Sequence, residues 1–372
     1  MDVTRAGQAP IRRYLYQKAV RQRAPLSGAF ELTPRCNMNC RMCYIRMSEE
    51  EMRARGREFS AAEWIAMGRA CRDEGTLFLL LTGGEPFLRP DFREIYTALH
   101  EMGFVISVNS NATLIDEETV KWLRRVPPSR VNVTLYGGSN ETYARLCRNP
   151  HGFDQATRGI RLLRQAGIPV LLNVSFTRAN AADMEAVYAF AREMDLAVRP
   201  AVYMFPPIRS AHETIVDDVR FSPEEAGEVM ARVEVCGRTP EALETFRRRV
   251  RAGLPCETEE DGECPRAAEE PMGCMAGRCS FWVTWDGRMT PCATMNEPTA
   301  HPFADGFAAS WRTIVQGVEP IRLPPACGAC RYRSICRVCG AVALAEGQGD
   351  STRRPDYMCR MTETYVRRLC EE

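Results

Sequence analysis

The sequence lacks any long hydrophobic run and any excess of charge of one sign. No apolar stretch approaches the roughly 20 residues of a membrane-spanning helix, and the N-terminus has no apolar signal-peptide core. The 49 lysine and arginine residues nearly balance 48 aspartate and glutamate residues over 372 positions. The basic runs at 5–23 and 247–249 are typical of solvated helix faces. We therefore expect a cytoplasmic protein with neither a nucleic acid nor a membrane as a partner.

Cysteine is the residue type that stands out, with 17 copies. A reducing cytosol does not convert so many thiols into a disulfide framework, so metal or cluster ligation is the natural explanation. Three of the cysteines lie within residues 36–43, few lie in the middle of the chain, and ten lie from Cys264 onward. This distribution predicts one site near the N-terminus and a cysteine-rich module near the C-terminus.

Between residues 29 and 205, short apolar β-rich runs alternate with helical segments. This alternation predicts an α/β fold with a parallel sheet, which right-handed crossovers curl. One predicted helix has clear ends, because Ser60 and Glu63 form a capping box and Gly75 lies beyond it. Six such units rather than eight predict an incomplete (β/α)6 barrel that is open at one side. The predicted strands span residues 29–33, 77–81, 104–109, 131–136, 170–176 and 196–202.

The sequence pattern changes again after the predicted barrel. Two prolines open a polar bridge in which Ser222 and Pro223 begin one of two predicted helices. Further on, cysteine spacing replaces apolar periodicity, as is expected of a small module held together by metal. The predicted parts are an N-terminal extension (1–28), the partial barrel (29–205), a helical bridge (206–270) and a cysteine-rich domain (271–372).

The first cysteine group follows the first predicted strand. Cys36, Cys40 and Cys43 have the spacing C-x3-C-x2-C. A cubane cluster takes four ligands, so three thiolates on one loop leave one iron open for a chelating ligand from outside the protein. On these residues alone, a zinc site completed by a distant residue and a set of three buried cysteines are the alternatives.

Two further strand ends carry groups suited to a ligand. Gly83 and Gly84 allow the backbone to approach a ligand closely, and the carboxylate of Glu85, which precedes Pro86, can hold an ammonium group. The third strand ends in polar residues that suit a ribose or an amino-acid carboxylate, although an Asx turn explains them equally well. These residues are Asn109, Ser110 and Asn111.

The cysteine spacing and the Gly-Gly-Glu-Pro motif on successive loops resemble the signature of the radical S-adenosylmethionine (SAM) superfamily. The resemblance covers about residues 29–205. It implies that Cys36, Cys40 and Cys43 hold a catalytic [4Fe-4S] cluster whose open iron binds S-adenosylmethionine. Reductive cleavage then yields methionine and a 5′-deoxyadenosyl radical, which abstracts a hydrogen atom from the substrate.

The resemblance also implies contacts to S-adenosylmethionine. Gly83 to Glu85 would contact the methionine ammonium, and Thr134 matches a hydroxyl that often contacts the cofactor's carboxylate. Met42 departs from the family, which usually has an aromatic residue there and uses its backbone towards adenine. An arginine after the fourth strand, Arg145 or Arg148, would also fit. The implied contacts are Met42, Gly83, Gly84, Glu85, Pro86, Asn109, Ser110 and Thr134.

The C-terminal cysteines form two groups, at 274–292 and 327–339, followed by a single cysteine at 359. Asp286-Gly287 between two β-rich segments predicts a hairpin that places Cys279 beside Cys292. Eight cysteines suffice for two sites of four, and their C-x2-C pairs predict zinc as readily as iron–sulfur. The eight are Cys274, Cys279, Cys292, Cys327, Cys330, Cys336, Cys339 and Cys359.

This order of cysteines resembles the SPASM extension of radical SAM enzymes, which implies two auxiliary [4Fe-4S] clusters. The spacing between Cys336 and Cys339 is one residue shorter than usual, and Cys264 is the candidate substitute for Cys339. The resemblance implies that the first cluster is held by Cys274, Cys279, Cys292 and Cys339, and the second by Cys327, Cys330, Cys336 and Cys359.

The SPASM resemblance implies a radical SAM oxidoreductase that modifies a ribosomally made peptide, by oxidative crosslinking or by epimerisation. Ala293 stands where sulfatase-maturing relatives carry an aspartate, which argues against that activity. Only 35 residues precede Cys36, too few for a leader-recognition domain. Either a separate protein presents the peptide, or recognition is weaker, or the substrate is small. A flavodoxin or ferredoxin would supply electrons.

Two alternatives to peptide modification stay open. One is a dehydrogenase or epimerase of a small metabolite, and the other is a non-enzymatic metal scaffold. No catalytic residue is assigned beyond the cluster and cofactor sites.

Overall fold

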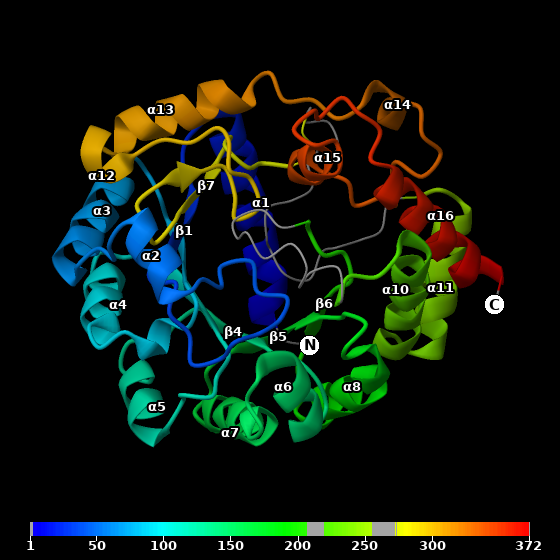
Figure 1. Ribbon diagram of the computed structural model, residues 1–372, viewed down its shortest axis with the longest axis horizontal. Coiled ribbons are helices and arrows are strands. Elements are labelled where there is room, and N and C mark those ends of the chain that lie inside the picture. Colours follow the sequence, from blue (N-terminus) through cyan, green and yellow to red (C-terminus); the bar gives the residue numbers. More distant parts are fainter. Residues whose placement is uncertain (1–2, 207–218, 255–271, 273, 372) are drawn as a thin grey trace.

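The protein is described by a computed structural model that covers residues 3–206, 219–254, 272 and 274–371. One sheet with the strand order β6-β5-β4-β3-β2-β1-β7-β8 forms its centre. Figure 1 shows helices α3 to α8 forming an arc outside the strands. The α/β class and the incomplete barrel predicted from the sequence are confirmed.

The first six strands are parallel to their neighbours, and each of them overlaps one of the six predicted runs. The last two strands were not predicted to belong to this sheet. They come from the C-terminal part, where β7 pairs in parallel with β1 and β8 pairs antiparallel with β7. The strands are β1 (Ser27–Glu31), β2 (Phe78–Thr82), β3 (Val105–Ser110), β4 (Arg130–Thr134), β5 (Val170–Ser175), β6 (Val198–Ala201), β7 (Ser280–Val283) and β8 (Met289–Thr290).

The helices that follow the strands bury one face of the sheet. In β3, Ile106 and Val108 are almost fully buried in the main core, whereas the alternate residues Ser107 and Asn109 are only partly buried. This alternation leaves polar side chains for the inner face of the barrel. The covering elements are α3 (Ala61–Asp73), α4 (Phe92–Glu101), α5 (Glu117–Leu123), α6 (Asn140–Cys147), α7 (Gly152–Gln165), α8 (Met184–Glu193) and the 3₁₀ turns η1 (Pro86–Leu88) and η2 (Ala181–Asp183).

Local sequence signals explain the helix ends. The capping box before α3 is confirmed, because the Ser60 backbone N–H donates to Glu63 at 2.8 Å and the Glu63 N–H donates to the Ser60 hydroxyl at 3.4 Å. Gly75, just after α3, has a φ of +95°, a value that favours glycine. Ser222 caps the helix that begins at Pro223, as predicted.

The remaining helices lie at the N-terminus, over the mouth of the barrel and in the C-terminal half. None of the helices in the described ranges is long and apolar enough to cross a membrane. These helices are α1 (Val3–Gln22), α2 (Glu49–Arg55), α10 (Pro223–Gly237), α11 (Pro240–Arg251), α12 (Pro302–Asp305), α13 (Phe307–Val318), α14 (Pro325–Gly328), α15 (Gly340–Glu346) and α16 (Asp356–Glu371).

A polar cluster joins the end of the barrel to the C-terminal half. The Tyr203 hydroxyl, just after β6, donates to the Glu346 carboxylate of α15 at 2.6 Å. Arg220 pairs with the same carboxylate and lies 4.1 Å over the ring of Tyr357 in α16. These contacts tie the last barrel strand to two C-terminal helices, so the open side of the barrel faces the cysteine-rich part.

Candidate functional site

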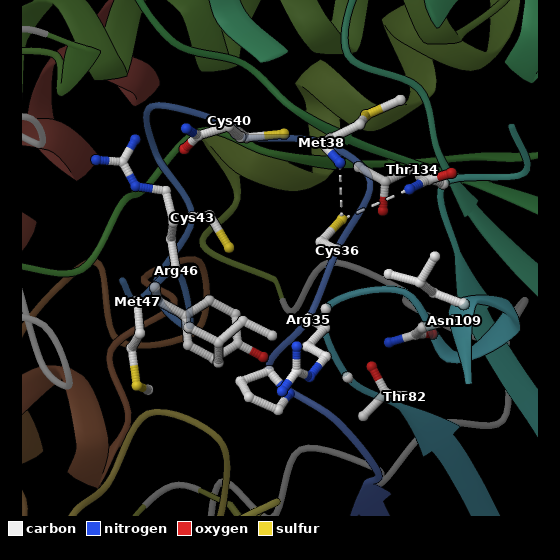
Figure 2. A pocket seen from close by; sticks show the side chains of 18 of the residues that line it. Arg35, Cys36, Met38, Cys40, Cys43, Arg46, Met47, Thr82, Asn109 and Thr134 are labelled. Carbon is white, nitrogen blue, oxygen red and sulfur yellow. Dashed lines mark hydrogen bonds between the residues drawn. The ribbon is translucent and has the colours of Figure 1, made fainter. Parts of the chain in front are cut away.

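The first cysteine group lies in the loop after β1, at the carboxyl ends of the parallel strands. The loop lines a cleft of about 690 Å³, and Figure 2 shows the side chains of Cys36, Cys40 and Cys43 around one end of it. Two backbone hydrogen bonds of 3.0 Å dock the loop on the end of α6, from Asn39 N–H to the Cys147 carbonyl and from Arg41 N–H to the Leu146 carbonyl. The fold therefore fixes the cysteine loop from a neighbouring helix.

The two glycines after β2 bring a second loop against the first. Gly84 N–H donates to the Thr33 carbonyl at 2.7 Å, and Glu85 N–H donates to the Arg35 carbonyl at 2.8 Å. A Cβ atom at position 84 would lie 2.2 Å from the Arg35 oxygen, so only glycine fits there without displacing the backbone. Gly83 and Gly84 both line the cleft. The motif thus supports the cysteine loop as well as exposing backbone to a ligand.

The carboxylate of Glu85 is fully buried and points towards the end of β3. It accepts hydrogen bonds from the Ser110 hydroxyl at 2.9 Å and from the backbone N–H groups of Asn111 at 2.8 Å and Phe87 at 3.1 Å. Burial raises the pKa of Glu85 to about 7, although these hydrogen bonds favour the charged form. This carboxylate therefore connects the loops after β2 and β3, and it does not line the cleft.

Asn111 connects the β3 loop to the cysteine loop. Its side-chain N–H donates to the Asn37 side-chain oxygen at 2.9 Å and lies 3.7 Å from the Cys36 sulfur. The Asn37 side-chain N–H donates to the Thr113 hydroxyl at 2.8 Å. The Asx turn that the sequence allowed is present, since the Thr113 N–H donates to the Asn111 side-chain oxygen at 3.0 Å.

The predicted cofactor contacts divide into two groups. Gly83, Gly84, Asn109, Ser110 and Thr134 line the cleft. Met42, Glu85 and Pro86 are buried behind it.

Burial makes the three thiols weak acids in the protein alone. Desolvation raises the pKa of Cys36 to about 12 and that of Cys43 to about 11. The pKa of Cys40 is raised well above its usual value, first by a hydrogen bond to Cys147 and then by burial. Thiolate ligation therefore needs a strong local positive charge, and iron supplies one. The donor set fits a metal cluster.

The spacing of ligands also bears on the zinc alternative. No three His, Cys, Asp or Glu side chains within the described part of the chain gather closely enough to hold one metal ion. A zinc site places its ligands about 2.0–2.3 Å from a single ion. In a cubane each thiolate bonds to a different iron, so the thiolates stand farther apart. The described residues therefore show no preformed site for a single ion at this loop.

The structure brings together the predicted second C-terminal set. Burial raises the pKa of Cys327, and the charges of Cys336, Cys359 and Cys330 raise it further. Arg354 donates a hydrogen bond to Cys359, and its own pKa is raised for that reason. Four thiols, three from the segment at 327–336 and one from α16, thus lie near one another.

The predicted first C-terminal set is divided. Cys274, Cys292 and Cys339 pack against the same group of buried residues, which includes Met272 and Met295. Cys279 is fully buried in another group, beside helix α1, with its sulfur 3.7 Å from the sulfur of Met275. The predicted hairpin is present as β7 and β8. The suggested substitute ligand Cys264 lies outside the described residues.

Sequence reasoning missed several residues that shape the cleft. The segment after Cys43 contributes Tyr44, Arg46, Met47 and Met52 to the lining. Its position directly after the cysteine triplet was the available signal. Cys147, at the end of α6, is fully buried and contacts Cys40.

Comparisons with known proteins agree with this geometry. A family model described as the radical SAM superfamily matches residues 30–191. An AdoMet-dependent heme synthase of Methanosarcina barkeri is 26% identical over 361 residues, which cover 90% of this chain and 96% of that protein. The structure of anSMEcpe with bound AdoMet and Kp18Cys peptide aligns with a TM-score of 0.67 at 16% identity, over 92% of this chain and 96% of that one. Streptococcus suis SuiB bound to its precursor peptide SuiA aligns with a TM-score of 0.62 at 16% identity, over 89% and 76%.

Proposed function

Because the chain belongs to the radical S-adenosylmethionine superfamily, we propose that it is a SPASM-type enzyme that oxidatively crosslinks or epimerises a ribosomally made peptide. The observation that carries this proposal is the cleft of about 690 Å³ in which the cysteine loop, the glycine loop and polar strand ends meet. Both solved structures named above were determined with a peptide bound, and their fold matches this chain. The open side of the barrel gives a peptide access to the cleft.

Residues at the cleft would hold the two cofactors. Cys36, Cys40 and Cys43 would ligate the catalytic [4Fe-4S] cluster. The exposed backbone of Gly83 and Gly84 would receive the ammonium group of S-adenosylmethionine. When bound, the two cofactors supply a 5′-deoxyadenosyl radical that removes a hydrogen atom from the substrate.

Polar strand ends would receive the rest of S-adenosylmethionine. Asn109, Ser110 and Thr134 offer side-chain donors and acceptors to its carboxylate and ribose. Met42 would contribute backbone near adenine. Glu85 would act by position, since its carboxylate holds the β2 and β3 loops together. Pro86 starts the 3₁₀ turn that follows this carboxylate.

Two auxiliary clusters would accept the electron that the substrate radical loses when it is oxidised to product. The gathering of Cys327, Cys330, Cys336 and Cys359 supports the second cluster. Cys274, Cys292 and Cys339 support the first, for which Cys279 stays the predicted fourth ligand. We also propose that the chain divides into four parts, with boundaries after residues 28, 205 and 270. A separate leader-binding protein would present the peptide, and a flavodoxin or ferredoxin would donate electrons.

The test is an anaerobic reaction of the reconstituted protein with S-adenosylmethionine, reductant and short peptides encoded beside its gene, run in deuterated water. We expect about twelve irons per chain, 5′-deoxyadenosine, and a peptide that has lost two hydrogens or gained one deuterium at carbon. A Cys36→Ala variant is the control and should form no 5′-deoxyadenosine. A fully loaded protein that forms none contradicts the proposal.

A small metabolite is the second candidate substrate, and one observation favours it. The AdoMet-dependent heme synthase matches nearly the whole length of this chain, including the cysteine-rich part. Under this alternative the same reaction mixture forms 5′-deoxyadenosine and leaves every peptide unchanged. A tetrapyrrole added in place of the peptide would then be modified.

A further inference from the structure

Arg46 is a charged side chain of the cleft. Its Nη1 atom is shielded from solvent and has no hydrogen-bond partner among the residues that the structure describes. Across the described residues the guanidinium also forms no ion pair. A guanidinium nitrogen that is shielded and unsatisfied is unfavourable, so an arginine in this position suits a ligand that carries an acceptor.

The other charged groups of the cleft are already paired. The Nε atom of Arg35 lies 2.8 Å from a Glu58 carboxylate oxygen. Glu49 lies 3.6 Å from Arg53 on the exposed helix α2. Arg46 therefore leaves a positive charge at the cleft that no described side chain neutralises, and an anion is the complementary ligand.

The position of Arg46 separates it from the groups that would hold S-adenosylmethionine. Figure 2 shows its guanidinium on the opposite side of Cys43 from Thr82 and Asn109. It follows the third cysteine by three residues, so it is near the reacting centre without belonging to the strand ends. This place suits a group of the substrate.

Apolar side chains also line this cleft. Met47 and Met52 line it, and Tyr44 and Leu88, which also line it, keep 39% and 41% of their surface exposed. Exposed apolar side chains and the Arg46 guanidinium in one cleft suit a ligand that has an apolar body and one carboxylate.

We propose that Arg46 recognises a carboxylate of the substrate and thereby sets which substrate bond lies beside the cluster. This inference rests on the proposed function, because it assumes that the cleft is the substrate site. An acidic residue of a peptide and a carboxylate of a small molecule would bind through the same charge-assisted hydrogen bonds. Arg46 is a specificity residue in this proposal and takes no part in cleaving the cofactor.

The experiment compares the full-length reconstituted protein with Arg46→Gln, Arg46→Lys and the control Arg72→Gln, which changes an exposed arginine outside the cleft lining. Each protein is titrated calorimetrically, with S-adenosylmethionine bound, against two matched pairs of probes. One pair is acetyl-Leu-Glu-Leu-amide and acetyl-Leu-Gln-Leu-amide. The other is 4-phenylbutanoate and 4-phenylbutanamide. Binding of S-adenosylmethionine alone and formation of 5′-deoxyadenosine without substrate are measured for every variant.

We expect the acid of at least one pair to bind the wild type about 10- to 100-fold more tightly than its amide, since a hydrogen bond to a charged group has that strength. Arg46→Gln should abolish this preference, Arg46→Lys should keep part of it, and Arg72→Gln should keep all of it. Discrimination in the peptide pair identifies a peptide carboxylate, and discrimination only in the other pair identifies a small acid.

Two results would overturn the inference. One is weaker binding of S-adenosylmethionine by Arg46→Gln, which would assign Arg46 to the cofactor. The other is equal or absent binding of acid and amide in both pairs. Failure of the proposed function itself is separate, because it would appear as a lack of 5′-deoxyadenosine in the wild type.

Discussion

The loop at 36–43 and the cysteine segment at 327–339 hold their thiols in different ways. Thr33 and Arg35, which lead into the first loop, accept hydrogen bonds from the glycine loop. The loop itself is hydrogen-bonded to α6, and Met38, Cys40 and Met42 within it are buried. In the second segment most residues are exposed or half-buried, Cys330 is exposed, and the backbone hydrogen bonds run mainly within the segment itself. The protein core organises the first group of thiols.

This difference indicates what metal does in each region. A loop fixed by its neighbours can exist before a cluster is bound, so there the metal adds chemistry. A segment with few buried residues gains its order from ligation, as in small metal-held modules. Removing metal should therefore affect activity in one region and folding in the other.

The largest expected effect comes from deleting one ligand in each region. Cys36→Ala should remove about four irons and all 5′-deoxyadenosine formation, with the thermal unfolding temperature nearly unchanged. Cys327→Ala should also remove about four irons, but should expose residues 321–339 to hydrogen exchange and proteolysis. Iron analysis and hydrogen-exchange mass spectrometry test both variants. Equal protection of 321–339 in the two variants would contradict the comparison.

A pair of glycines sharpens the same comparison with a smaller change. In Gly84→Ala the new Cβ meets the Arg35 carbonyl oxygen at 2.2 Å, whereas a Cβ at Gly328 meets nothing within 4 Å. We expect Gly84→Ala to lose about 1–3 kcal/mol of unfolding free energy and to load less catalytic cluster. Gly328→Ala should change the unfolding free energy by less than about 0.5 kcal/mol. Urea unfolding and iron content are the measurements, and equal effects at the two sites would refute this account.

Much of the barrel could be predicted because its signals are local. Six apolar runs, the Ser60 capping box and the cysteine spacing each lie within a few residues of sequence. The pairing of β7 with β1 could not be predicted in this way, since the strands are about 250 positions apart. Neither strand's sequence indicates which other strand it pairs with. Strand pairing at that distance depends on which edge the folded barrel leaves open.

The residue types at the site could be predicted from the sequence, but the orientation of their side chains could not. Gly83 and Gly84 were found from the motif, but the motif does not reveal that the Glu85 carboxylate turns towards Ser110. Arg46 and Cys147 could be found only from tertiary contacts, because neither lies in a recognisable spacing. Side-chain direction and burial are set by packing, which a single sequence does not display.

A smaller effect is expected at Cys147, which lies behind the first loop. Its thiol is fully buried and hydrogen-bonded to Cys40. Such a bond to a cluster ligand stabilises the reduced, more negative state. Cys147→Ala removes this hydrogen bond and with it about 1 kcal/mol of stabilisation of the reduced cluster. The reduction potential of the catalytic cluster should therefore fall by roughly 40 mV. A redox titration followed by electron paramagnetic resonance measures it, with Cys71→Ala, another fully buried thiol, as the control. Equal potentials in the wild type and both variants would show that Cys147 only packs.

A separate effect concerns the pH dependence of the unfolding free energy at Glu85. Burial raises its folded pKa to about 7, above the usual 4.5, so the carboxyl is favoured in its neutral form. Its contribution to stability is therefore fully present below about pH 4.5 and is lost as pH rises through 7. Glu85→Gln cannot ionise, so its unfolding free energy should rise relative to the wild type by roughly 2–3 kcal/mol between pH 5 and 8. Urea unfolding of the protein without S-adenosylmethionine measures this difference, and parallel pH profiles for the two proteins would mean that Glu85 is ionised in the folded state throughout that range.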